Sequence, residues 1–266
     1  MVLLTPKEYI GKGYDEVFKV VEIGFGYGEL LAYLSGYSDI PIFGVDISNF
    51  SFEKAQGRLK DRDVYLIKAD GYFFLKYMNS PQSIRDLYIL FPDPWPKAPS
   101  RRLINVDFVE LVASRVAERV YIATDHEEYF EEIINVFRNS GYFEIEDWDL
   151  PISTKYMRKW LSMGRSFRSF CFVKKRDSGY GYQRALLSLE GVFLDLDIFR
   201  GRDFILKKRE TFESKGSKKI ISYLYCEKNF TFNYYFKVQD NYLRSLNTCG
   251  EVLPPNMRIL VKGNAL

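Results

Sequence analysis

Short apolar runs alternate with amphipathic segments along the first two thirds of the chain. Apolar runs rich in β-branched and aromatic residues predict strands at 17–25, 41–47, 64–70, 86–91 and 119–125. The segments between them predict helices at 27–37, 50–61, 71–78, 105–118 and 127–141, the last one ending at Gly141. Two later runs, 142–149 and 167–175, are expected to be antiparallel strands. This alternation is typical of an α/β fold with a doubly wound sheet.

The pattern changes after about Arg176. A turn-rich junction, "RDSGYGYQRA", precedes a region without a helical period, in which 204–212, 218–227, 230–239 and 257–263 are predicted strands. "SKGS" at 214–217 is expected to form a hairpin loop. Residues 178–266 hold 14 Lys and Arg against 9 Asp and Glu, and 14 of the 42 Phe and Tyr. We therefore predict an α/β domain over 1–177 and a small C-terminal all-β domain over 178–266.

Composition and overall charge narrow the class of protein only a little. The net charge of +3 over 266 residues indicates no particular partner. Cys171, Cys226 and Cys249 are too few and too scattered for a disulfide framework, which favours a reducing compartment. The single histidine, His126, argues against a histidine-based metal site. The N-terminus lacks a basic region, its apolar run stops at Pro6, and no segment approaches the ~20 apolar residues of a membrane span. We expect a cytoplasmic protein without metal or membrane contact.

Three glycines, Gly24, Gly26 and Gly28, stand between the first predicted strand and the next helix, in "VEIGFGYGEL". Glycine is needed where a ligand packs against the backbone. The third glycine of the dinucleotide fingerprint G-x-G-x-x-G would fall at position 29, which is Glu29. A carboxylate at a helix N-terminus repels a pyrophosphate, so the loop favours a nucleoside without phosphate. A tight turn with no ligand is the alternative.

Acidic residues stand at the ends of the predicted strands. Glu22, Asp46 and Asp70 end the first three, and Asp93 follows the fourth. Ligands of doubly wound folds bind at this carboxyl edge, where Asp46, 22 residues past Gly24, could accept both ribose hydroxyls. Asp70 would be within reach of an adenine amino group. An acidic crevice of this kind fits S-adenosylmethionine, whose amino group and sulfonium are cationic. Each acid could instead be a helix cap.

Four prolines surround Asp93 in "LFPDPWPKAPSRR", residues 90–102. Many methyltransferases that act on an exocyclic amine have D/N-P-P-Y/F at this position, whereas this chain has "DPW". The difference favours a ring nitrogen with a free lone pair, such as guanine N7, which needs no deprotonation. Rigid prolines suit a reaction that depends on positioning. The alternative is a structural connector with Trp95 as a hydrophobic plug.

Basic residues follow the proline-rich loop and recur downstream. Lys97, Arg101 and Arg102 come directly after it, and "TKYMRKWLSMGRSFRSF" at 154–170 interleaves Lys and Arg with aromatic residues. Because basic groups neutralise phosphates and aromatic faces stack on bases, these segments favour a nucleic-acid surface. A solvated basic face over core aromatics is the alternative. Asp125, at the end of the fifth strand, could accept hydrogen bonds from a guanine edge or cap the next helix.

These stretches resemble the bacterial tRNA (guanine-N7-)-methyltransferases from about Val20 to Phe172. The matching strings are "VEIGFGYG", "FGVD", "KAD", "LFPDPWPK" followed by "RRL", "IATD" and "STKY". The F-P-D-P-W-x-K string after a strand is very specific to that family. The resemblance implies a Rossmann-like methyltransferase that uses S-adenosylmethionine to methylate N7 of guanosine 46 in the tRNA variable loop. Residues 178–266 lie outside it.

The resemblance also implies roles for individual residues. Asp93 would be the catalytic residue and, with Glu22, Asp46 and Asp70, would contact the cofactor. The implied substrate contacts are Lys97, the 99–102 stretch with Arg101 and Arg102, Asp125, Thr154, Lys155, Tyr156 and Met157.

The chain departs from the family pattern at three points. Asp46 stands where Glu is usual, and the basic loop "KAPSRR" is short. Met157 replaces a Glu whose carboxylate it cannot supply.

Three other classes of protein remain open from the sequence. One is a methyltransferase that acts on an exocyclic amine, and another is a non-catalytic RNA-binding protein that retains the fold. The third is a nicotinamide-dependent oxidoreductase, against which Glu29 and the missing third glycine count.

Overall fold

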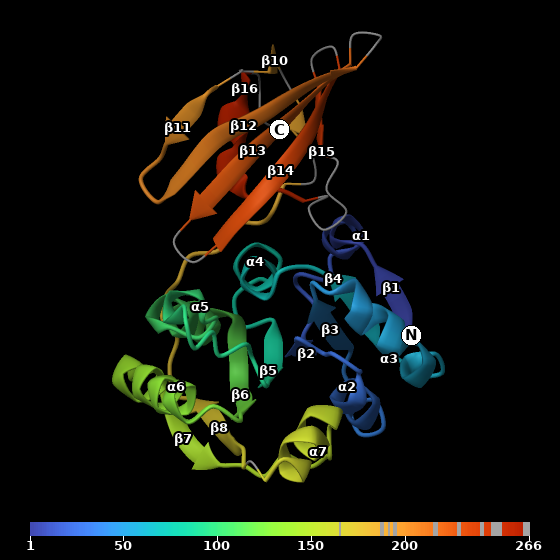
Figure 1. Cartoon of the computed structure of the whole chain (residues 1–266), viewed down its shortest axis with the longest axis vertical. Coiled ribbons are helices and arrows are strands. Elements are labelled where there is room, and N and C mark those ends of the chain that lie inside the picture. Colours follow the sequence, from blue (N-terminus) through green and yellow to red (C-terminus); the bar gives the residue numbers. More distant parts are fainter. Residues whose placement is uncertain are drawn as a thin grey trace.

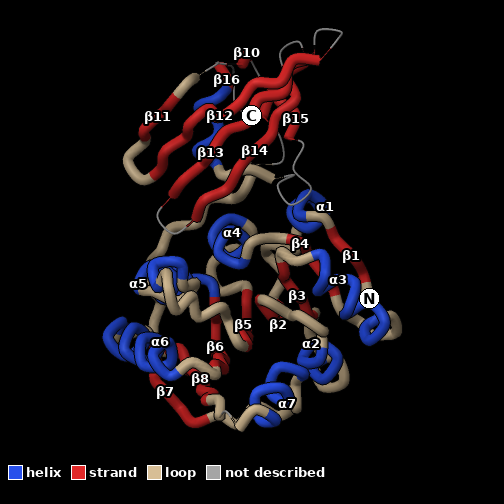
Figure 2. Tube along the Cα trace, in the orientation of Figure 1, coloured by secondary structure: helices blue, strands red, loops and turns tan. Residues whose placement is uncertain are grey.

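The structure is a computed structural model of the whole chain, shown in Figures 1 and 2. It describes residues 1–164, 166–186, 189–190, 192–193, 196–214, 218–227, 230–239, 242–245 and 252–262. Arg165 and Cys249, both considered in the sequence analysis, lie outside these residues, as do the side chains of Tyr156 and Trp160.

The first part of the chain is built on one eight-stranded sheet with the order β1-β4-β3-β2-β5-β6-β8-β7. All neighbours pair in parallel except β8, which is antiparallel to both β6 and β7. The strands are β1 Val2–Leu4, β2 Lys19–Ile23, β3 Ile42–Asp46, β4 Tyr65–Lys68, β5 Ile84–Leu90, β6 Val116–Thr124, β7 Phe143–Asp147 and β8 Arg168–Lys174. The predicted doubly wound sheet is confirmed, including its two antiparallel late strands.

Helices cover both faces of this sheet. They are α1 Pro6–Gly11, α2 Glu29–Leu34, α3 Asn49–Leu59, α4 Gly71–Tyr77, α5 Val106–Arg115, α6 Glu127–Ser140 and α7 Lys155–Ser162, with a 3-10 turn, η1, at Pro99–Arg101. Buried residues of α1, α4, α5 and α6 share one apolar cluster, whereas those of α2 and α3 belong to a second cluster across the sheet. In Figure 1, α5 and α6 lie on one side of the central strands, and α2 and α3 lie on the other.

Strand order reverses between β2 and β5, because β3 and β4 extend the sheet one way and β5 and β6 the other. Chain crossovers leave to opposite faces at such a switch point, and a crevice opens outside the carboxyl ends of the two strands. In Figure 1 the arrowheads of β5 and β6 point away from the β-rich last part of the chain. The crevice therefore lies at the carboxyl ends of the strands.

The last part of the chain is almost entirely β structure, as predicted. A six-stranded antiparallel sheet has the order β11-β12-β13-β14-β15-β9, and β10 pairs with β16. The elements of this last part of the chain are β9 Leu189–Glu190, β10 Val192–Phe193, β11 Ile198–Arg200, β12 Phe204–Ser214, β13 Lys218–Glu227, β14 Phe230–Gln239, β15 Tyr242–Ser245, the 3-10 turn η2 Pro255–Leu260 and β16 Val261–Lys262. Ser214 pairs with Lys218, so the predicted hairpin is present, although 215–217 lie outside the described residues.

The predicted and observed elements differ at several points. The strand expected at 257–263 is mostly the turn η2, because Met257 and Leu260 are buried three positions apart rather than in alternation. Helix α7 was not predicted, since only eight residues form it and most of its described side chains are exposed. The N-terminal pair β1 and α1 was not predicted either.

The apolar core of the first part continues into the β-rich part. Ala185, Leu206, Tyr223 and Phe236 are buried in the same cluster as residues of α4 and α5. The aromatic residues of β13 and β14 mainly fill this interior, so their number reflects packing rather than exposed stacking surfaces. The division at 177/178 stays a prediction.

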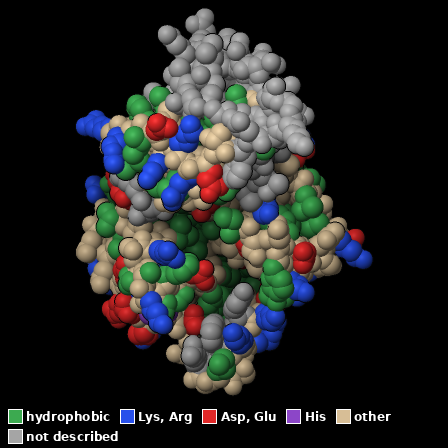
Figure 3. Space-filling view, turned by 45° about the horizontal axis from the view of Figure 1, so that its top comes forward, with side chains coloured by type: hydrophobic (Ala, Val, Ile, Leu, Met, Phe, Trp, Pro, Cys, Tyr) green, Lys and Arg blue, Asp and Glu red, His purple; other side chains and the backbone are tan. Residues whose placement is uncertain are grey.

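The face drawn in Figure 3 mixes side chains of both charge signs. Among the described residues drawn there, Lys and Arg are scattered among acidic and apolar side chains and do not gather into one basic patch. The face is hollowed near its centre, with hydrophobic side chains around the hollow.

Candidate active site

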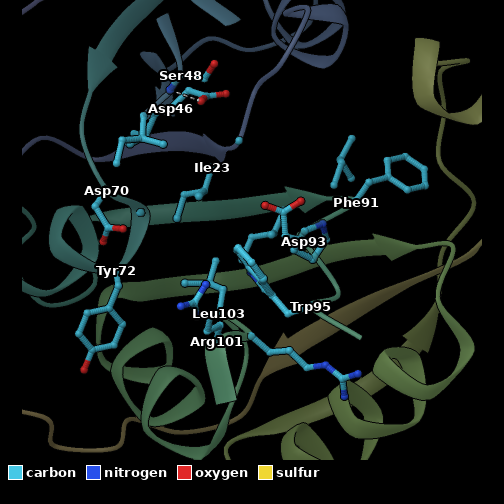
Figure 4. Close-up of a pocket in the computed structure, with 18 of the residues that line it drawn as sticks. Ile23, Asp46, Ser48, Asp70, Tyr72, Phe91, Asp93, Trp95, Arg101 and Leu103 are labelled. Carbon is cyan, nitrogen blue, oxygen red and sulfur yellow. Dashed lines mark hydrogen bonds between the residues drawn. The ribbon is translucent and has the colours of Figure 1, made fainter. Parts of the chain in front are cut away.

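A cavity of about 430 Å³ opens at the switch point between β2 and β5. It is lined from the ends of β2, β3, β4 and β5 and by the proline-rich loop, residues 91–102, which follows β5. Figure 4 shows Asp46 with Ser48 from one strand end, Asp70 from the next, and Asp93 with Trp95 from the proline-rich loop. Three of the four predicted acids therefore line one cavity.

The three glycines after β2 are in different surroundings, so glycine is needed at each position for a different physical reason. Gly24 has a φ of +77°, lines the cavity, and has open space where a Cβ would stand. Gly28 has a φ of +67°, but a Cβ there would lie 2.9 Å from Leu59 Cδ1, so helix packing also requires glycine. Gly26 donates its N–H to Asp46 Oδ2 at 3.2 Å. Of the three, Gly24 is the one that opens directly onto the cavity.

Asp46 and Asp70 are held by backbone donors. Asp46 also accepts from Ser48 N at 2.8 Å, so each of its oxygens already has one N–H partner. Asp70 caps α4 by accepting from Phe73 N at 2.9 Å, and burial raises its pKa above the usual value. The helix-cap alternative thus holds for Asp70. Both carboxylates retain lone pairs toward the cavity, because each oxygen can accept more than one hydrogen bond.

Glu22 lies behind the glycine loop and does not line the main cavity. Its side chain is buried, and within the described part of the chain Oε2 has no hydrogen-bond partner. Burial, followed by the nearby charge of Asp46, raises the pKa of Glu22 to about 8. A small adjoining pocket connects Glu22 with Gly24, Phe91 and Thr154. A buried carboxyl group that has one oxygen without a partner and lies beside a ligand crevice is suited to a cationic ligand.

The proline-rich loop is strained on both sides of Asp93. Phe91 and Trp95 have φ angles of 53° and 42°, in the left-handed region that non-glycine residues seldom adopt. Each such residue costs on the order of 1–3 kcal/mol and persists when its surroundings enforce it, often at functional sites. The loop therefore presents exposed Asp93 to the cavity in one fixed conformation.

Two adjacent arginines of this loop have opposite environments. The Arg101 guanidinium is exposed and lies 5.1 Å from the centre of the Trp95 ring, whose residue is 39% exposed. Arg102 is buried, donates from Nε to Pro94 O at 2.8 Å, and forms ion pairs with Glu128 and Glu132 of α6. Arg102 also lines the cavity, but its guanidinium anchors the loop to α6, so its contact with a substrate stays a prediction.

The 154–157 segment begins helix α7. Thr154 is buried and its Oγ1 accepts from Met157 N at 3.2 Å, while the Met157 side chain is also buried. Lys155 is exposed. Glu29 accepts from Lys155 N at 2.7 Å and pairs with Arg158 at 2.8 Å, so this acid holds α7 against the glycine loop. No local pattern could have indicated this contact, which spans 126 positions.

The remaining predicted substrate residues lie outside the main cavity lining. Lys97 is exposed on the loop, and Asp125 is half-buried just after β6. The cap of α6 is His126, whose Nδ1 accepts from Tyr129 N at 3.2 Å, rather than Asp125. Ser48, Tyr72 and Trp95 line the cavity without having been predicted to do so.

Metal sites and membrane spans were searched in the described residues alone. No group of three or more His, Cys, Asp or Glu side chains there is arranged to hold a metal ion. In the same part of the chain, every helix is too short or too polar to cross a bilayer.

A doubly wound sheet with an acid-lined cavity at its switch point defines a Rossmann-like nucleoside-binding protein. More specifically, the chain belongs to a methyltransferase family, because the family model described as "Putative methyltransferase" matches residues 16–169. This match covers strands β2 to β7, the glycine loop and the proline-rich loop.

Several proteins similar to this chain are named as methyltransferases. A tRNA (guanine-N(7)-)-methyltransferase of Thermotoga maritima is 36% identical over 169 residues, which cover 59% of this chain and 53% of the relative. One of Thermus thermophilus is 29% identical over 219 residues, covering 69% of this chain and 70% of the relative. The chain thus spans about half the length of the first of these relatives. A solved methyltransferase structure from Streptococcus mutans, in complex with SAH, aligns at 14% identity with a TM-score of 0.42, over 64% of this chain and 95% of its own.

Proposed function

We propose that the chain is a tRNA methyltransferase that uses S-adenosylmethionine to methylate N7 of a guanosine, at position 46 of the variable loop. The observation that carries the proposal is the single cavity that joins Asp46 and Asp70 to the strained loop around Asp93. The two relatives named above, both tRNA (guanine-N(7)-)-methyltransferases, support the same reaction.

The residues present fit S-adenosylmethionine. Asp46 and Ser48 offer acceptors and a hydroxyl to a ribose, and Asp70 offers an acceptor to an adenine amine. The buried carboxyl of Glu22, with one oxygen unpartnered in the described part of the chain, is suited to an ammonium group, and Gly24 leaves room for a ligand against the backbone. When bound, the cofactor supplies an electrophilic methyl group on a sulfonium.

The protein itself would contribute to the reaction by positioning the purine and by stabilising the charge that develops on it. Guanine N7 has a free lone pair, so no base is needed to deprotonate it. The fixed proline-rich loop would hold the purine against Asp93, and alignment of reacting groups alone reaches effective molarities on the order of 10⁵–10⁸ M in favourable cases. The Asp93 carboxylate would stabilise the positive charge that develops on the imidazole ring.

Phosphate and base contacts are proposed for the exposed residues around the cavity. Lys97, Arg101 and Lys155 would meet the RNA, and Asp125 would read a guanine edge. Arg102, Thr154 and Met157 are proposed instead as residues that position the loop and α7. Tyr156 stays a prediction, because its side chain lies outside the described ones.

The direct test is methylation of an unmodified tRNA transcript with labelled S-adenosylmethionine, followed by mapping of the modified nucleotide. The expected product is alkali-labile N7-methylguanosine at position 46. A labelled but alkali-stable product would identify an exocyclic-amine enzyme. Binding of tRNA without any transfer would support a non-catalytic RNA-binding protein, and binding of NADH in place of S-adenosylmethionine would support an oxidoreductase.

For residues 178–266 we propose an added tRNA contact through the outer face of the six-stranded sheet. Arg200 on β11 and Lys207 and Arg209 on β12 are exposed, and the pairing of Arg200 with Ile205 and of Ile198 with Lys207 brings the two strands' outward residues together. None of these three residues lines the cavity, so a partner that contacts both must extend from this face to the cavity. Replacing Lys207 and Arg209 with Gln should reduce the salt slope of log affinity by about 0.7–0.9 per lost phosphate contact. An unchanged slope would leave this part a role in stability.

A further inference from the structure

A cluster of exposed aromatic and basic side chains lies beside the cavity, on the side of the glycine loop. Phe50, at the start of α3, is 51% exposed, and Ile47, which lines the cavity, is 53% exposed. Tyr27 of the glycine loop meets Phe50 edge to face, with ring centres 6.0 Å apart. The apolar surface therefore continues outward from the cavity mouth across two elements.

Each of the two rings has an ammonium group next to it. Lys54 Nζ lies 5.0 Å from the centre of the Phe50 ring, and Lys155 Nζ donates to the Tyr27 hydroxyl and lies 4.1 Å from the centre of that ring. These lysines come from α3 and α7, which are about a hundred positions apart in the sequence. Ring and cation are thus paired twice on one small surface that three separate elements build.

The charge of this surface is positive where it is exposed. Glu29 neutralises part of Arg58 and Arg158, at 3.8 and 2.8 Å. In the portion of the chain that the structure describes, Lys54 and Lys155 are paired with no carboxylate. Both lysines are exposed, so their charges are available to a phosphate.

We propose that Tyr27, Phe50, Lys54 and Lys155 form a docking surface for an unstacked RNA strand, here called the α3 rim. The aromatic faces would stack on bases, and the two ammonium groups would contact the phosphates between them. A nucleotide that enters the cavity must leave its stack, so the nucleotides on either side of it must be held by the surface beside the cavity. Stacking rings and cationic groups together can hold them. The inference rests on the proposed function, since tRNA is the RNA in question.

Ile47 follows β3 and Trp95 lies in the loop after β5, and these two strands flank β2 in the sheet, so the two residues line the cavity from either side of β2. Together the α3 rim and the Trp95–Arg101 pair would hold the RNA strand on both sides of the nucleotide that enters. A protein partner fits this surface less well, because the two ammonium groups next to the aromatic rings limit the apolar area that such a partner could bury.

The test measures binding of an unmodified tRNA transcript by fluorescence anisotropy at several salt concentrations. Phe50→Ala should weaken binding by about ten-fold through lost stacking. Lys54→Gln should reduce the salt slope of log affinity by about 0.7–0.9, the value expected for one phosphate contact. Neither residue lines the cavity, so calorimetric affinity for S-adenosylmethionine should stay as in the wild type.

Matched controls lie at other edges of the fold. Phe18, 44% exposed before β2, and Lys60, with a 71% exposed side chain after α3, are replaced by Ala and Gln respectively and should leave tRNA binding unchanged. If Phe50→Ala and Lys54→Gln bind tRNA as tightly and with the same salt slope as the wild type, the α3 rim is not an RNA surface and the proposed function still stands. A wild-type protein that does not bind tRNA would overturn both.

Discussion

Asp93 is the residue on which the proposed chemistry depends, and its backbone neighbours explain how it is held. Phe91 and Trp95 both have positive φ angles, and Pro92 and Pro94 fix the backbone between them. Arg102 then ties Pro94 O to helix α6. The strain of the loop is offset by contacts outside it, which is why a short exposed segment can keep one conformation.

Replacing Asp93 with Ala should lower the rate of methyl transfer by about 10²–10³, the loss typical of removing one group that stabilises transition-state charge. Affinity for tRNA should change little, because the phosphate contacts are elsewhere. Single-turnover kinetics with a saturating transcript separates the two effects. A variant with a near-normal rate would refute the role given to this carboxylate.

Glu22 carries the most informative pKa near the site. The value of about 8 means that at pH 7 the unliganded protein mostly holds this proton. The unfolded chain releases it near the ordinary value of 4.5, so this residue makes the folded state lose stability as pH rises from about 4.5 to 8. A cationic ligand next to it would favour the carboxylate and lower its pKa.

Binding of S-adenosylmethionine should therefore release a proton from Glu22 between pH 6 and 8, with affinity rising by up to about ten-fold per pH unit. Calorimetry at pH 7 in two buffers of different ionisation enthalpy measures the proton directly. Glu22→Gln should abolish the dependence on buffer. Proton release that persists in this variant would assign the titration to another group.

At the scale of elements, the proline-rich loop and α7 are both placed by long-range ion pairs. Arg102 reaches α6, and Glu29 at the start of α2 holds the first turn of α7. Arg101, one position earlier than Arg102, has no such anchoring partner in the described contacts and rests on Trp95. The two adjacent arginines thus make different contacts: Arg102 with helix α6, and Arg101 with Trp95 of its own loop.

Arg101→Ala and Arg102→Ala form a matched pair. Arg102→Ala should lower the free energy of unfolding by about 1–3 kcal/mol, because it removes charged hydrogen bonds from a buried guanidinium whose carboxylate partners are themselves partly exposed. Arg101→Ala should leave stability within about 0.5 kcal/mol and weaken tRNA binding. Denaturant unfolding and anisotropy measure the two quantities. The reverse pattern would contradict the assignment.

At the scale of the whole molecule, the two parts share a buried polar junction. Glu227 on β13 is 5% exposed, pairs with Lys76 of α4 at 2.5 Å, and accepts from the hydroxyls of Tyr77 and Tyr225. Arg115 donates to the carbonyls of Leu75 and Gly181, which binds the junction segment to the same helix. Because α4 begins at Asp70, one helix connects the cavity with the β-rich part.

Glu227→Ala should lower the free energy of unfolding by about 3–5 kcal/mol, since it leaves Lys76 largely buried without a counter-charge. Asp197→Ala, at a side chain 93% exposed in the pair with Lys208, should change it by less than about 0.5 kcal/mol. Urea unfolding of both variants provides the comparison. Equal, small losses would show that the junction contributes little to holding the two parts together.

The sequence alone determined the α/β alternation, the antiparallel late strands and the acidic edge, because each follows from a local period or from a residue at a strand end. "VEIGFGYG" and "LFPDPWPK" likewise indicated where the crevice would be lined. Only the tertiary structure decided that Arg102 is buried, that Glu29 holds α7, and that Tyr223, Tyr225, Tyr234 and Phe236 of β13 and β14 are buried. Those outcomes depend on which elements meet across the fold, and a local pattern does not contain the positions of residues that are distant in the sequence.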